Sequence, residues 1–200
     1  DVCSSDLVII AVVAQENLGA TLSQAGLASG IYVIGTLLAR LYVGKKLEVL
    51  GRRQTLRVGI VLYFITTLMY LYMPSLMVLY IVRLLNGFFY GTVSTATNAI
   101  VTEYIPLSRR GEGINYYGLS TSLAAAIGPF LGMLLLQATS IDFIVMMSSV
   151  ILAFTVVGCL MLKVNNLDLT KDQRALADSW KINTFIDSKV VFIATIAFVM

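Results

Sequence analysis

Hydrophobic residues run along this chain in long blocks that carry no charge. Five stretches without Lys, Arg, Asp or Glu cover residues 17–39, 58–82, 84–102, 114–141 and 143–162. A helix that crosses a bilayer needs about 20 residues at a rise of about 1.5 Å each, so every block is long enough for one crossing. The pattern predicts full membrane helices over residues 21–44, 56–73, 75–102, 114–137 and 142–163.

Both ends of the chain are expected to be truncated. Residues 7–15 read as part of a helix, and another begins near residue 189 and continues to Met200. The bundle is therefore expected over 8–163, a polar connection over 164–188, and the start of a further helix over 189–200. Residues 1–7, DVCSSDL, would place Asp1 and Asp6 near the middle of the membrane, at a cost of several kcal/mol. A common sequencing-adaptor end translates to these seven residues, so they are expected to be an adaptor-derived artefact.

Basic residues occur in every second connection. They gather in residues 40–57, 109–110 and 163–189, whereas the turns at 15–21, 73–75 and 137–142 contain none. The positive-inside rule assigns the basic connections to the cytoplasm. The chain is thus expected in a bacterial cytoplasmic membrane as a multi-pass protein, with loops 2–3, 4–5 and 6–7 on the cytoplasmic side.

Composition agrees with this interpretation and narrows the function. Hydrophobic residues make up 58% and charged residues 12%, with a mean hydropathy of +0.86, a net charge of +3 and no histidine. Soluble domains are usually about a quarter charged, so lipid is the expected surroundings. Without histidine or a carboxylate deep in a predicted span, an intramembrane enzyme has little to build on. We expect no enzyme, cofactor, metal site or nucleic-acid partner.

The connection between the second and third helices reads GKKLEVLGRRQTL, and the one after the fourth helix reads EYIPLSRRGEG. The first resembles the signature of the major facilitator superfamily, G-x-x-x-D-(R/K)-x-G-R-(R/K)-(R/K), with Glu in place of Asp. In that family these loops form a cytoplasmic charge network that stabilises the outward-open state. The resemblance implies a gating role, and a pairing of Glu103 with Arg52 or Arg53, for Gly44, Glu48, Gly51, Arg52, Arg53, Glu103, Arg109 and Arg110.

Two further stretches resemble motifs of the same family. Arg83 and Gly87 match its R-x-x-x-G element, whose arginine is associated with proton coupling. Gly87 and Gly91, with Thr95 and Asn98, form a small and polar stripe on the face of Arg83, which suits close helix packing. In the fifth helix the antiporter motif, which marks exporters, is partly matched by Gly118, Gly128, Pro129 and Gly132.

The resemblance implies an all-α fold: the six-helix N-terminal half of a 12-helix transporter, joined to a C-terminal half by the long polar connection. It implies a proton-coupled exporter of a small organic molecule, and the stretch from Ile105 to Gly132 looks most like drug- and metallophore-exporting members. The substrate cavity is expected to include Tyr32, Asn98, Asn115 and Tyr116. An importer or facilitator of a metabolite or sugar, and a non-transporting receptor, remain as alternatives. The titrating carboxylate is open, since Glu16, Glu103 and Asp142 lie near helix ends.

Overall fold

The computed structural model describes residues 19–72 and 74–161, and the regular structure in this part of the chain is entirely helical. Helices α2, α3, α4, α5 and α6, together with the short 3-10 helices η1 and η2, include five segments long and apolar enough to cross a membrane. The all-helical prediction is confirmed for these residues. The predicted artefact, first partial helix, polar connection and last helix lie outside them. The elements are α2 (Leu22–Leu50), α3 (Arg52–Leu68), η1 (Met69–Leu71), α4 (Leu76–Tyr104), η2 (Leu107–Arg109), α5 (Arg110–Ala138) and α6 (Ile141–Met161).

Polar caps determine where α2 and α4 begin. Thr21 and Gln24 form a capping box, in which each side chain accepts a hydrogen bond from the backbone N–H of the other. Ser75 Oγ accepts from the backbone N–H of Val78 at 3.4 Å and caps α4. Both helices start at the same end of the bundle, called here the Ser75 end, and both finish at the opposite end, called the Gly51 end.

The predicted loop between residues 44 and 56 is wrong. Helix α2 continues to Leu50 and α3 begins at Arg52, so Gly51 alone separates them. The prediction ended each helix where charged residues begin. However, a helix of 29 residues is about 44 Å long and extends beyond a hydrocarbon core of about 30 Å, so its last turns can carry Lys45, Lys46 and Glu48 in the polar interface. For the same reason α5 begins at Arg110 rather than at residue 114.

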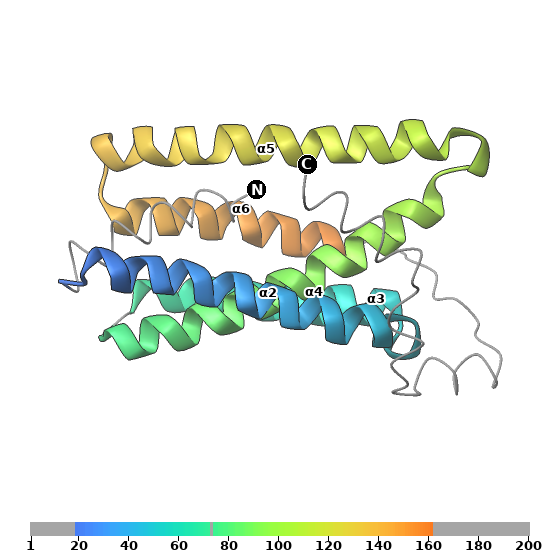
Figure 1. Cartoon of the computed structure of the whole chain (residues 1–200). Coiled ribbons are helices and arrows are strands. Elements are labelled where there is room, and N and C mark those ends of the chain that lie inside the picture. Colours follow the sequence, from blue (N-terminus) through green and yellow to red (C-terminus); the bar gives the residue numbers. More distant parts are fainter. Residues whose placement is uncertain (1–18, 73, 162–200) are drawn as a thin grey trace.

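Helix α4 is the centre of the described bundle. It packs along α2 and against α3, while α3 also contacts α6 (Figure 1). Helix α5 lies at the edge and contacts α4 and α6 only lightly. Buried apolar clusters join α2 to α4 near each end, with Leu79 against Ala25 and Ala28 at the Ser75 end and Leu56 among residues of α2 and α4 at the Gly51 end. Because α2 and α4 are parallel, equal depths along them lie side by side.

Candidate functional site

The turn at the Gly51 end depends on glycine. Gly51 has φ 84° and ψ 124°, a backbone conformation that residues with a Cβ rarely adopt. Its N–H donates to the carbonyl of Leu47 and its own carbonyl accepts from the N–H of Thr55, both at 3.0 Å. The residue therefore closes α2 and opens α3 without leaving its own backbone groups unsatisfied.

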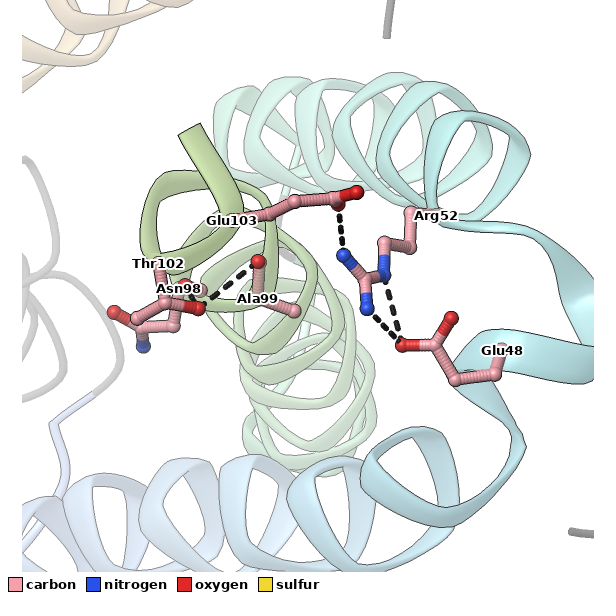
Figure 2. Close-up of polar contacts among 6 residues, drawn as sticks. All are labelled: Glu48, Arg52, Asn98, Ala99, Thr102 and Glu103. Carbon is pink, nitrogen blue, oxygen red and sulfur yellow. Dashed lines mark hydrogen bonds and ion pairs between the residues drawn. The ribbon is translucent and has the colours of Figure 1, made fainter. Parts of the chain in front are cut away.

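Three charged side chains meet beside this turn, and we call them the Arg52 triad: Glu48 on α2, Arg52 on α3 and Glu103 on α4. Arg52 Nε donates to Glu48 Oε1 at 2.8 Å, Nη2 pairs with the same oxygen, and Nη1 pairs with Glu103 Oε2 (Figure 2). The side chain of Arg52 is only 12% exposed, against 30% for Glu48 and 40% for Glu103. One guanidinium thus joins three helices, and the pairing expected between Glu103 and an arginine of the turn forms with Arg52.

The other residues of the expected gating motif lie apart from the triad contacts. A Cβ at Gly44 would meet nothing within 4 Å, so no described contact requires glycine there. Arg53 is half-buried in the first turn of α3. Arg109 and Arg110 are exposed where η2 meets α5, and neither forms an ion pair with the residues that the structure describes.

Arg83 is fully buried in the first half of α4. Its guanidinium carbon lies 5.4 Å from the ring centroid of Tyr32 on α2 and 5.6 Å from that of Tyr70 on η1, so the cation stacks with two aromatic rings. The sequence predicted an arginine within the membrane but not its aromatic neighbours, because the position of Tyr70 on η1 depends on how the helices pack.

Glycines let α2 and α4 approach to backbone contact. A Cβ on Gly87 would lie 2.2 Å from the carbonyl oxygen of Tyr32, and one on Gly91 would lie 2.7 Å from that of Thr36. Gly35 makes the reciprocal approach, since its Cβ would lie 2.4 Å from the carbonyl oxygen of Leu84. Sequence analysis identified Gly87 and Gly91 but missed Gly35, although the spacing of four residues from Gly35 to Ala39 is a small-residue signal.

Asn86 forms a second polar connection within the bundle. It is fully buried on α4, and its Nδ2 donates to the hydroxyls of Thr66 at 3.1 Å and Thr67 at 3.2 Å on α3. Each threonine hydroxyl in turn donates to the carbonyl of Tyr63. Asn86 was not predicted as a structural residue, because a lone amide in an apolar helix does not reveal its partners.

The glycines and proline of the expected antiporter motif lie on α5. The helix continues through Pro129 from Arg110 to Ala138. Gly132 is buried, Gly128 and Pro129 are half-buried, and a Cβ at Gly118 would meet nothing within 4 Å. Within the described residues, tight packing in this motif is therefore limited to its second half.

The four residues expected in a substrate cavity do not come together. Tyr32 is buried against Arg83 and Tyr90, whereas Asn115 and Tyr116 are exposed on α5. Asn98 does line a recess of about 380 Å³ between α2, α4 and α5. On α5 the predicted residue was Tyr116, whereas its neighbour Tyr117 is the one that lines the recess. The full lining is Arg40, Tyr90, Val93, Ser94, Thr97, Asn98, Tyr117 and Thr121.

Comparison with known proteins places these features in a family. The sequence profile of the Major Facilitator Superfamily matches residues 3–200. The chain belongs to the major facilitator superfamily. Its members are membrane transporters rather than enzymes, so the described helices are part of a multi-pass transporter fold.

Several members of the superfamily are similar to this chain. An uncharacterized MFS-type transporter of Methanocaldococcus jannaschii is 30% identical over 124 residues, which cover 62% of this chain and 32% of that protein. The uncharacterized MFS-type transporter YfkF of Bacillus subtilis is 30% identical over 140 residues, covering 70% and 35%. Monosaccharide-sensing protein 2 of Arabidopsis thaliana is 36% identical over 95 residues, covering 48% and 13%. The chain spans about a third of the length of the first two superfamily members.

Proposed function

We propose that this chain is part of a proton-coupled exporter that moves a small organic molecule, such as a drug or a metallophore, by alternating access. The observation that carries the proposal is the Arg52 triad, in which one half-buried guanidinium joins α2, α3 and α4 at the Gly51 end. Basic residues accompany this end, including Lys45 and Lys46, so we assign it to the cytoplasm of a bacterial cell.

The triad suits a gate because its ion pairs are of moderate strength. Half-exposed ion pairs contribute about 0.2–1 kcal/mol each, so the two pairs together stabilise the closed Gly51 end by roughly 0.5–2 kcal/mol. Since about 1.4 kcal/mol changes an equilibrium tenfold, the triad would bias the transporter toward the outward-open state. It would still break readily when the helices separate to open inward.

Direction and coupling rest on two other features. Gly128, Pro129 and Gly132 match part of the antiporter motif, and Gly132 is buried. This favours export. Arg83 is permanently charged, so in proton coupling it would act on a carboxylate that meets it in one of the two states. Glu16 is the candidate from the sequence and lies outside the described residues.

The test uses everted membrane vesicles that contain the product of the full-length gene. Movement of candidate drugs and metallophores into the everted vesicles, which corresponds to export from the cell, is measured with and without an imposed pH gradient. We expect accumulation that requires the gradient and that a protonophore abolishes. Accumulation at the same rate without a gradient would refute antiport, and uptake in the opposite direction would favour the importer alternative.

Sensing is the second candidate, because the similarity to a monosaccharide-sensing protein points to it. Gly51→Leu separates the two functions. A leucine at φ 84° would strain the α2–α3 turn and displace the triad, so transport should collapse while membrane expression changes little. A receptor should still bind its ligand with this substitution, so retained binding with no transport in the unsubstituted protein would support sensing.

A further inference from the structure

Arg40 lies within the membrane-spanning segment of α2, and its side chain is exposed among the described residues. Helices α2 and α4 each have 29 residues, with their middles at residues 36 and 90. Arg40 is four residues past the middle of α2, or about 6 Å, whereas the hydrocarbon core extends about 15 Å from its centre. The recess that Arg40 lines also begins at Tyr90, the middle residue of α4. With α2 and α4 centred in the bilayer, both helices place this arginine inside the hydrocarbon core.

The recess is polar at that depth. Besides the guanidinium of Arg40, it presents the hydroxyls of Ser94 and Thr97 and the amide of Asn98 from α4. Helix α5 adds two more hydroxyls, from Tyr117 and Thr121. The Asn98 side chain points away from Arg52, on the opposite side of α4 (Figure 2), so the recess is distinct from the Arg52 triad.

The charge of Arg40 is not neutralised by the described part of the bundle. The ion pairs of the Arg52 triad do not include Arg40, and Arg40 makes no ion pair with a described carboxylate. An arginine near the middle of a membrane helix costs about 2.5–3.5 kcal/mol on insertion scales, and such residues almost always face a water-filled cavity or a partner. The recess of about 380 Å³ provides such a cavity.

Extension of the side chain to the nearer membrane surface is a poor alternative. Side chains on a helix lean toward its N-terminus. The N-terminus of α2 is at the Ser75 end, so this general lean directs the exposed Arg40 side chain along α2 and away from the nearer Gly51 end. Its position beside Tyr90 and Ser94 agrees with that direction.

We propose that this recess binds the anionic group of the transported substrate, with Arg40 as the charged anchor. The substrate class is then a small organic anion bearing a carboxylate, phosphate or sulfonate. A guanidinium donates two parallel hydrogen bonds to such groups, and the hydroxyls and amide of α4 and α5 complete the polar surface. The volume is at the lower end of ligand pockets, which suits a small molecule. This inference rests on the proposed transport function, whose substrate it specifies.

The test measures the charge preference of the recess with thiol reagents. In the full-length transporter, native cysteines are replaced by serine, including Cys159→Ser, and Thr97→Cys is introduced into the recess. The cysteine is treated with an anionic sulfonatoethyl and with a cationic trimethylammonioethyl methanethiosulfonate. Each reaction rate is divided by the rate at which the same reagent reacts with free mercaptoethanol. We expect the anionic reagent to be favoured about tenfold, because a full charge within about 7 Å changes the local reagent concentration by that order.

Two substitutions and one control position make the result specific. Arg40→Gln should remove the preference and Arg40→Lys should keep it, whereas Ser140→Cys, in the turn between α5 and α6, should be insensitive to both. If the anionic and cationic reagents reacted at equal normalised rates while Arg40 is intact, the proposal would be overturned. It would also be overturned if Thr97→Cys did not react at all, and neither result needs an Arg40 variant. The assay does not depend on transport. If the anion preference were present but gradient-driven efflux were absent, the proposed exporter function would be refuted and the proposed anion site would not.

Discussion

The contact between α2 and α4 gives the sharpest prediction for stability, through Gly87→Ala. The new Cβ would lie 2.2 Å from the carbonyl oxygen of Tyr32, and ordinary contact begins near 3.4 Å, so the helices must separate by about 1.2 Å. Overpacking of this kind costs about 1–3 kcal/mol. Separation also weakens the hydrogen bond from Thr36 Oγ1 to the carbonyl of Gly87, 3.1 Å long, which at a typical value for membrane proteins adds about 0.6 kcal/mol.

The expected loss of stability is therefore roughly 2–4 kcal/mol. At about 2–4 °C per kcal/mol for a bundle of this size, the unfolding midpoint should fall by roughly 4–16 °C. The assay is thermal unfolding of the detergent-purified full-length transporter, followed by fluorescence-detected size exclusion. Gly30→Ala and Gly118→Ala are matched controls, since a Cβ at either glycine would meet nothing within 4 Å. If Gly87→Ala melted with these controls and the unsubstituted protein, the proposed backbone contact between α2 and α4 would be wrong.

Three further substitutions test other contacts. Glu103→Gln removes one ion pair of the triad, which contributes about 0.2–1 kcal/mol. A cysteine placed in the recess should therefore become about 1.5- to 5-fold more accessible to reagents from the cytoplasm. Glu112→Gln, which changes no described ion pair, is the control, and equal accessibility in the two variants would argue against a gate. Asn86→Ala removes two interhelical hydrogen bonds, so the midpoint should fall by a few degrees; an unchanged midpoint would contradict their contribution. Arg57→Gln removes the bond to the carbonyl of Leu160, and proteolysis after α6 should become faster, whereas unchanged cleavage would show that Arg57 does not restrain this end.

Helix existence could be predicted from the sequence, because long charge-free blocks have one stable form in lipid. The helix ends could not be predicted as well. Charged residues such as Lys45 and Glu48 mark where a helix leaves the hydrocarbon, not where it ends, and the break is determined by the backbone of Gly51 alone. The starts of α2 at Leu22 and of α4 at Leu76 lie one residue from the predicted starts at 21 and 75.

The site was predictable where a local motif contains the interaction. Glu48 and Arg52 lie in one motif on either side of Gly51, and the family resemblance implied the charge network that they form. The stacking of Tyr70 on Arg83 and the lining of the recess by Tyr117 depend on how distant helices are rotated about their axes. One residue of helical rotation is about 100°, so the sequence alone could not show that Tyr117 lines the recess while Asn115 and Tyr116 are exposed.

The connection between α2 and α3 is a single residue, so the two helices cannot move independently at this end. A flexible loop would absorb a tilt of one helix, whereas Gly51 is fixed by hydrogen bonds to Leu47 and Thr55 on both sides. Movement of the end of α2 must therefore displace the start of α3 in the same step. Arg57, one and a half turns further along α3, bonds the last turn of α6. A displacement of the end of α2 would therefore be passed through Gly51 and Arg57 to the last turn of α6.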